Sequence, residues 1–288
     1  MIIVTGATGQ LGRLIVAQLV QRVPVHQVGV SVRKVSRAKD LEALGVRVRH
    51  GDFSDPDSLR HAFEGAAQVL IVSSNARSLG GDPLAQHRAA IDAARATGAR
   101  RIAYTSHMAA NATSAFPPML DHAATEDMLR QSGIAWTALR HGFYAASGIA
   151  LMGDTMETGV LEAPADGKVS WTAHADLAEA AAIIMAHEGR YDGPTPPLTG
   201  AEALDLTDLA SIASELLNRP VHRQIIGDAD LRAKMTARGT PKPVVDIALG
   251  LYVASRNGEF ATVDPALEQL LCRRPAIARD ILATKIHG

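Results

Sequence analysis

The chain has 288 residues, of which 47% are hydrophobic and 20% are charged, and its formal net charge is −1. This length predicts one large α/β domain or a domain with a smaller lobe, and the near-neutral charge argues against nucleic acid or a membrane surface as a partner. Cys272 is the only cysteine, which excludes a disulfide within the chain, and with no signal-peptide pattern or membrane-length apolar run we expect a cytoplasmic protein.

Strand-like and helix-like segments alternate through the first half of the chain. Short apolar runs predict buried strands at residues 2–4, 28–32, 46–48, 69–72, 101–105 and 134–139. Helical patterns lie between them at residues 14–20, 36–44, 56–63, 83–97 and 122–131. This alternation predicts an α/β fold with a doubly wound parallel sheet of the Rossmann type and right-handed crossovers.

The alternation loosens after about residue 145, and helical patterns dominate at residues 174–186, 207–217, 229–236, 243–254, 264–271 and 275–284. We therefore predict a Rossmann domain over residues 1–145 that binds NADP. Residues 146–288 then form a smaller, mostly helical substrate lobe, interleaved with the first and not independent of it. The substrate is expected in a cleft between the two, outside the carboxyl ends of the strands.

A glycine-rich turn at residues 5–12, Thr-Gly-Ala-Thr-Gly-Gln-Leu-Gly, joins the first strand to the first helix. In this position the pattern is typical of a dinucleotide site. Gly6 permits the tight turn, Gly9 lets the backbone approach a pyrophosphate, and Gly12 lets the helix pack on the sheet. The helix N-terminus offers N–H groups and a positive dipole end to the phosphates. The predicted cofactor contacts here are Gly6, Ala7, Thr8, Gly9, Gln10 and Leu11.

The end of the second strand indicates which nicotinamide cofactor binds. An NAD site usually carries an acidic residue there, but this chain has Arg33 and Lys34, then Arg37, with no acid before Asp40. Guanidinium groups suit a 2′-phosphate, so NADP(H) is favoured. The alternative is that these basic residues simply lie in solvent at the start of a helix, although positive charge at that end opposes the helix dipole.

Two further strand ends carry polar residues. After the third strand, Asp52 and Phe53 are placed to hold an adenine, and the alternative for Asp52 is a turn-capping role before the next helix. After the fourth strand, the small residues Ser73, Ser74 and Asn75 would let the cofactor lie across the sheet edge. A plain strand-ending turn is the alternative for these three.

With these residues in place, the chain resembles the NmrA-like atypical short-chain dehydrogenases. Within them it is most similar to the type 2 NAD(P)H:quinone oxidoreductases and the triphenylmethane reductases. The segments that carry the resemblance are residues 4–12, 32–33, 49–53, 102–106, 122–129, 139–144 and 166–168.

The resemblance implies reduction by NADPH of a planar, electron-poor aromatic such as a quinone. It places Arg33 at the 2′-phosphate and residues 6–11 at the pyrophosphate. It places Arg140, His141, Gly142, Phe143 and Tyr144 beside the nicotinamide, and adds Lys168 to the cofactor contacts. The family often has Asn where this chain has His141, whose tautomer and charge we expect to vary near neutral pH.

The usual acid–base pair of short-chain dehydrogenases, Tyr-x-x-x-Lys, is missing, because no tyrosine has a lysine four residues later. Quinone reduction does not need that pair, so orientation is expected to matter more than acid–base catalysis. Phe143 and Tyr144 are predicted to form a flat wall for the acceptor, or else to pack in the core. His107 and His122 are candidate polar contacts or proton sources, or else surface or capping residues. The catalytic candidates are thus Tyr144, His107 and His122.

The functional prediction is an NADPH-dependent reductase of a small aromatic acceptor, acting as a monomer or homodimer. The alternative is a non-catalytic NADP(H)-sensing regulator of the NmrA-like type. No metal site is predicted, since the histidines lack ligand spacing and a single cysteine excludes thiolate clusters.

Overall fold

A computed structural model describes residues 1–287, with the side chain of the last of these left out. The chain divides into two compact units. The first unit contains Met1–Ser106, Asp121–Arg140 and Leu177–Pro196, and the second contains His107–Leu120, His141–Asp176 and the chain from Pro197 onward. The domain boundary at residue 145 that we expect from the sequence stays a prediction.

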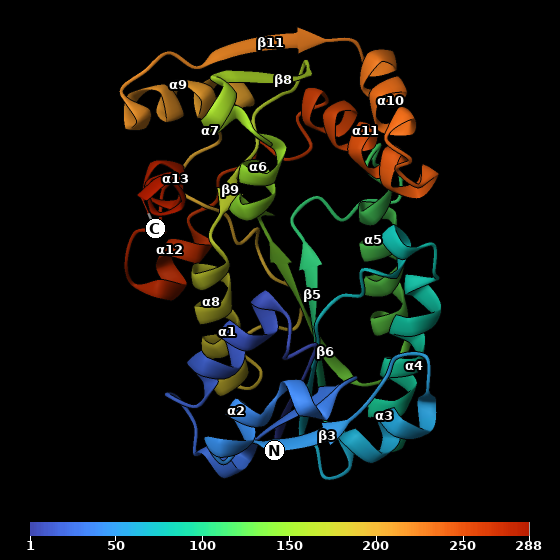
Figure 1. Cartoon of the computed structure of the whole chain (residues 1–288). Coiled ribbons are helices and arrows are strands. Elements are labelled where there is room, and N and C mark those ends of the chain that lie inside the picture. Colours follow the sequence, from blue (N-terminus) through green and yellow to red (C-terminus); the bar gives the residue numbers. More distant parts are fainter. Residues whose placement is uncertain (288) are drawn as a thin grey trace. The chain divides into compact units, whose positions relative to one another are not determined.

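A seven-stranded sheet forms the centre of the first unit (Figure 1). Its strands, in spatial order, are β10 (Gly193–Pro194), β6 (Ala135–His141), β5 (Arg101–His107), β4 (Gln68–Ile71), β1 (Ile2–Thr5), β2 (Val28–Val32) and β3 (Arg47–His50). The strands run parallel, with Ile2 opposite both Val28 and Gln68. The predicted Rossmann sheet is therefore confirmed, and the strand order reverses beside β1, where such folds bind ligands.

The helices that belong to this sheet connect its strands. They are α1 (Gln10–Leu19), α2 (Lys39–Ala43), α3 (Pro56–Phe63), α4 (Pro83–Ala96), α5 (Pro117–Gln131) and α8 (His174–Ala186), with 3₁₀ turns at Val25–Gln27, Val35–Arg37 and Ala76–Leu79. Three of the predicted helices differ from this description. α1 begins at Gln10 rather than at residue 14, the predicted helix at residues 36–44 is a 3₁₀ turn followed by α2, and α5 begins at Pro117 rather than His122.

Clear start signals explain why α3 and α4 begin where the sequence predicts. Asp55 accepts hydrogen bonds from two N–H groups of the first turn of α3, and Asp82 does the same for α4. Each cap is followed by a proline at the first helical position, whose missing N–H needs no partner there. Apolar side chains from these helices and from the sheet, among them Ile3, Phe63 and Ile71, form the core of the unit.

The second unit is mostly helical, as predicted, but it also contains short strands that the sequence did not indicate. Its helices are α6 (Ala145–Leu151), α7 (Thr155–Thr158), α9 (Leu206–Leu217), α10 (Asp228–Ala237), α11 (Lys242–Arg256), α12 (Ala266–Leu271) and α13 (Ala278–His287). Two small parallel pairs join β8 (Val160–Pro164) to β11 (His222–Ile226) and β7 (Phe143–Tyr144) to β9 (Trp171–Thr172). Figure 1 shows β8 and β11 side by side.

Candidate functional site

The glycine turn after β1 has the geometry that the fingerprint requires. Gly6 has φ +62°, a conformation that disfavours residues with a Cβ atom. The N–H of Gly9 donates to the Gly6 carbonyl oxygen at 2.9 Å. A Cβ atom on Gly12 would lie 2.4 Å from that same oxygen, so only glycine lets α1 pack this closely on the turn. The described part of the chain places no acidic side chain in the first turn of α1 and no side-chain cap at Gly9. The N–H groups of that turn therefore suit an anion.

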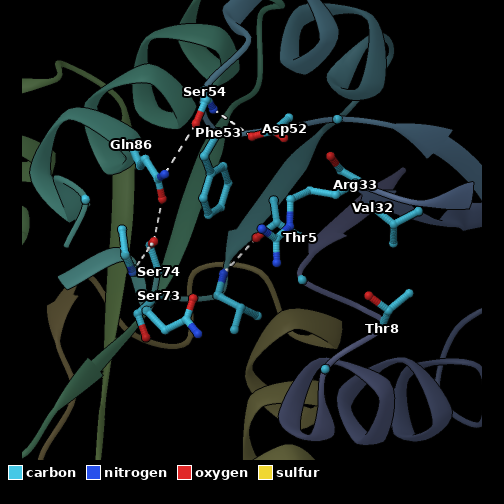
Figure 2. A pocket seen from close by; sticks show the side chains of 18 of the residues that line it. Thr5, Thr8, Val32, Arg33, Asp52, Phe53, Ser54, Ser73, Ser74 and Gln86 are labelled. Atoms are coloured by element: carbon cyan, nitrogen blue, oxygen red, sulfur yellow. Dashed lines mark hydrogen bonds between the residues drawn. The ribbon is translucent and has the colours of Figure 1, made fainter. Parts of the chain in front are cut away.

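A cavity of about 510 Å³ lies at the carboxyl ends of β1, β2, β3 and β4 in the first unit. Figure 2 shows it from close by. Its lining residues are Thr5, Gly6, Thr8, Gly9, Ser31, Val32, Arg33, Arg37, Gly51, Asp52, Phe53, Ser54, Val72, Ser73, Ser74, Asn75, Ala76, Leu79, Gly81 and Gln86. The sheet thus brings together four predicted segments that are separated in the sequence.

Two guanidinium groups, those of Arg33 and Arg37, line this cavity. Both side chains are exposed, and neither has an ion-pair partner among residues 1–287. The first acid after β2, Asp40, instead pairs with Arg13 of α1. The neighbouring Lys34 is exposed but does not line the cavity within the described chain. Unpaired guanidinium groups at the end of β2 suit a phosphate.

The Asp52–Phe53 segment both forms a turn and lines the cavity. One carboxylate oxygen of Asp52 accepts from the N–H of Ser54 at 2.9 Å, which shapes the turn, while the cap of α3 is Asp55. The aspartate nevertheless lines the cavity. The Phe53 ring packs partly on the core of the unit and points into the cavity in Figure 2. An aromatic face beside a carboxylate suits a purine base.

A chain of hydrogen bonds holds the segment after β4. The N–H of Ser74 donates to His87 Nε2 at 2.9 Å, and His87 Nδ1 donates to the Thr125 hydroxyl at 2.8 Å. That hydroxyl in turn donates to the carbonyl oxygen of Asp121, so the imidazole accepts at Nε2 and is neutral. Burial lowers the pKa of His87 to about 4 and keeps it neutral. The buried imidazole of His87 therefore holds the turn after β4 in place.

Gln86, on α4, links two of the strand ends. Its side-chain oxygen accepts from the Ser74 hydroxyl, and its amide nitrogen donates to the Ser54 hydroxyl at 3.4 Å, as Figure 2 shows. Ser31 also lines the cavity, and its buried hydroxyl has no hydrogen-bond partner in the described part of the chain. Sequence reasoning missed both residues, because neither belongs to a motif.

Arg140 and His122 belong to the first unit and have partners within it. The Arg140 guanidinium makes two hydrogen bonds to Glu126, at 3.1 and 2.7 Å, and these bonds raise its pKa. Glu126 also accepts from the Ser106 hydroxyl at 2.7 Å. His122 Nδ1 lies 2.8 Å from the hydroxyl of the buried Tyr104. The charge of Arg140 is thus already balanced by a carboxylate.

The predicted residues that follow β6 belong to the second unit. The backbone at Gly142 passes close to Thr172. A Cβ atom on residue 142 would lie 2.2 Å from Thr172 Oγ1, so a glycine is needed there. Phe143 is 7% exposed and packs in an aromatic cluster, with its ring 5.0 Å from that of Phe260 and 5.5 Å from that of Trp171. This placement corresponds to the core-packing alternative for Phe143.

His141 is fully buried, and neither ring nitrogen has a hydrogen-bond partner within residues 1–287. Burial, with smaller contributions from His107 and His174, lowers its pKa to about 3. The ring therefore stays neutral near pH 7, and the change of charge that we expected there is wrong. His107 accepts from the Ala109 N–H at 3.1 Å through Nδ1, and burial lowers its pKa to about 3 as well.

Tyr144 and Lys168, the last two predicted contacts, have different kinds of neighbour: a ring contact for Tyr144 and ion pairs for Lys168. The Tyr144 ring lies 4.3 Å from that of His174, centroid to centroid, and burial raises the pKa of its hydroxyl to about 12. Lys168 pairs with Asp205 at 3.0 Å and with Asp208, both at the start of α9, and these bonds raise its pKa. Its ammonium group therefore stabilises the capping box of that helix.

The predicted cofactor contacts thus fall into three groups. Those that line the cavity are Gly6, Thr8, Gly9, Arg33, Asp52, Phe53, Ser73, Ser74 and Asn75. Ala7, Gln10 and Leu11 belong to the same turn and helix without lining it in the described structure. Arg140 is bonded elsewhere in the first unit, and residues 141–144 and Lys168 are in the second unit. For every one of these residues the cofactor contact stays a prediction.

Fold and cavity together define a dinucleotide-binding α/β protein. The family model described as "NAD(P)H-binding" matches residues 6–188, and the chain belongs to this family. It is 35% identical to "Quinone oxidoreductase 2" of Escherichia coli over 94% of this chain and 93% of that protein. The resemblance that we stated from the sequence is confirmed.

Solved structures give the same result. The E. coli NADPH-dependent quinone oxidoreductase QOR2 in complex with NADPH matches with a TM-score of 0.92 and 33% identity, over 100% of both chains. The Citrobacter sp. triphenylmethane reductase in complex with NADP(H) matches with a TM-score of 0.87 and 31% identity, over 99% of this chain and 100% of that one.

No helix within residues 1–287 is long and apolar enough to cross a bilayer. Over the same residues, no group of three or more His, Cys, Asp or Glu side chains is placed to hold a metal ion.

Proposed function

We propose that the protein is an NADPH-dependent reductase that transfers a hydride to a quinone or a similar planar aromatic acceptor. The observation that carries the cofactor assignment is the pair of unpaired guanidinium groups, Arg33 and Arg37, in the cavity at the end of β2. Membership of the NAD(P)H-binding family and the similarity to quinone oxidoreductase 2 support the reaction. The proposed setting is the cytoplasm, where the exposed Cys272 stays reduced.

The cavity offers groups for the adenine, the 2′-phosphate and the pyrophosphate of the dinucleotide. The turn at Gly6–Gly9 would present backbone N–H groups to the pyrophosphate, and Arg33 with Arg37 would bind the 2′-phosphate. Phe53 and Asp52 would hold the adenine. The cavity fits a dinucleotide for two reasons. Gly6 and Gly12 leave no side chain in the turn after β1, and the buried Ser31 hydroxyl lacks a hydrogen-bond partner within the described chain.

NADPH, when bound, supplies a hydride to the acceptor and is oxidised to NADP⁺. A quinone takes up that hydride and one proton from water to give a hydroquinone, so no strong protein acid is needed. The described residues agree with this, since the buried Tyr104 hydroxyl is bonded to His122 rather than poised by a lysine. The chain mainly binds and orients the two reactants.

A steady-state assay with NADPH and a panel of benzoquinones and naphthoquinones tests the proposal. We expect NADPH oxidation that depends on the quinone, with hydroquinone formed in equal amount. Tight NADPH binding without turnover of any quinone would instead favour the non-catalytic sensing alternative. In that case the oxidised and reduced cofactors should be compared for binding and for release of a protein partner.

A further inference from the structure

A side-chain amide, that of Gln86 on α4, lines the same cavity of the first unit as the Phe53 ring. The amide bonds to hydroxyl groups at two strand ends, those of Ser54 after β3 and Ser74 after β4, as Figure 2 shows. Ser54 directly follows Phe53 in the chain. The amide and the aromatic ring therefore belong to the same part of the cavity, where we expect the adenine.

The start of α4 holds Gln86 in place. Asp82 caps the helix by accepting hydrogen bonds from two N–H groups of its first turn. The residue after Gln86, His87, is buried and accepts from the Ser74 N–H at 2.9 Å. Two neighbouring residues of α4 thus bond to one serine, His87 to its backbone and Gln86 to its hydroxyl. A side chain held in this way loses little freedom when a ligand binds.

The two serines also orient the amide. The Ser74 hydroxyl accepts from the Ala76 N–H at 3.1 Å and donates its own hydrogen to Gln86 Oε1. Gln86 Nε2 donates to the Ser54 hydroxyl at 3.4 Å. An amide oxygen accepts two hydrogen bonds and an amide nitrogen donates two. With these as its partners among residues 1–287, the half-buried amide keeps one acceptor site and one N–H for a ligand.

An acceptor beside a donor matches the hydrogen-bonding pattern of adenine. The 6-amino group of adenine is a donor, and the ring nitrogens next to it are acceptors. A glutamine amide therefore meets this base with two parallel hydrogen bonds, as it does in DNA recognition. In hypoxanthine an oxygen replaces the amino group, so the oxygen of an amide in this orientation would face another acceptor.

We propose that Gln86 selects the adenine base of the cofactor, with Oε1 accepting from the 6-amino group and Nε2 donating to the adjacent ring nitrogen. This inference rests on the cofactor assignment of the proposed function and goes beyond it by naming the residue that distinguishes the base. The Phe53 ring offers a flat face to any purine. The amide rejects a 6-oxo purine, because the wrong base leaves its polar groups unpaired.

Two substitutions separate base recognition from the link between the strand ends. Gln86→Met keeps a side chain of similar length and removes both hydrogen-bonding groups. Gln86→Glu keeps oxygens that accept from both serine hydroxyls but has no N–H to donate. Gln131→Met, at the exposed end of α5 in the same unit, is the matched control.

Each protein is titrated with NADPH and with the analogue in which hypoxanthine replaces the adenine, in the absence of an acceptor. A paired amide discriminates against the wrong base by about 10-fold or more. We expect the wild type and the control to bind NADPH about 10-fold more tightly than the analogue. In both Gln86 variants this ratio of Kd values should fall to about threefold or less, with Asp52 still present beside the base.

A ratio that keeps its wild-type value in either Gln86 variant overturns the inference, even if both Kd values rise, because Gln86 then only holds the strand ends together. Equal binding of NADPH and the analogue by the wild type overturns it as well. The ratio does not depend on the fraction of folded protein, so a destabilised variant still gives an answer. A wild type that binds no NADPH refutes the cofactor assignment and this inference with it, whereas absence of quinone turnover refutes only the proposed reaction.

Discussion

Replacing Arg33 by alanine should weaken NADPH binding and leave NADH binding nearly unchanged. A hydrogen bond to a charged group contributes about 1.5–3 kcal/mol. The Arg33 side chain is exposed, and Arg37 remains as a second guanidinium in the same cavity. Solvent screening and the remaining cation place the single substitution at the lower end, about 1.5 kcal/mol, or roughly a tenfold higher Kd for NADPH. The double variant Arg33→Ala/Arg37→Ala should lose about 100-fold.

Titration of both cofactors, by calorimetry or by the fluorescence of the reduced nicotinamide, measures these constants. Lys34→Ala is the matched control, because Lys34 is exposed beside Arg33 but does not line the cavity in the described structure. We expect it to bind both cofactors as the wild type does. If Arg33→Ala weakens NADPH and NADH equally, or if Lys34→Ala discriminates between them as strongly, the 2′-phosphate assignment is wrong.

Two further predictions follow from the turn and from the buried histidines. Gly12→Ala should reduce both stability and NADPH affinity, because its methyl group would lie 2.4 Å from the Gly6 carbonyl oxygen; a melting temperature and a Kd equal to those of the wild type would contradict the close-packing argument. The free energy of unfolding should be highest above about pH 6.5 and should fall as the pH drops toward 4. His87 and His141 stay neutral in the folded protein over this range, whereas in the unfolded chain they bind protons. Together these two residues should lower the free energy of unfolding by up to about 3 kcal/mol for each pH unit between about pH 6 and pH 4, and urea midpoints that do not change between pH 7 and pH 5 would refute this.

The sequence predicts the first unit well, because its signals are local. The strand at residues 28–32 and the helix at residues 56–63 have the predicted ends, the helix because an aspartate cap and a proline mark its start. The strands β8 and β11 were missed, because their five-residue runs pair across about 60 residues of chain, and no local pattern shows such a pairing. The early start of α5 was missed because Pro117 and Pro118 suggest a loop, although proline is well tolerated in the first helical turn.

The site was predictable where it follows strand ends and not where it depends on helix packing. Arg33, Asp52 and Ser73 each lie within two residues of the end of a strand, and parallel strands bring their carboxyl ends to one edge. Gln86 lies within α4, and nothing in its local sequence distinguishes it from any other helical glutamine. Its place between two strand ends depends on how α4 packs against the sheet.

Charge in the sequence does not show which cations are available to a ligand. Arg33, Arg140 and Lys168 are all predicted cofactor contacts with a positive charge, but the fold gives Arg140 a buried carboxylate and Lys168 two aspartates. A cation already bonded to a carboxylate must break that pair to meet a phosphate, which offsets much of the gain. Arg33 and Arg37 have no such pair among residues 1–287, so a 2′-phosphate meets them without that cost. Because the two remaining candidates are balanced within their own units, we expect the preference for NADPH over NADH to depend on the two guanidinium groups at the end of β2.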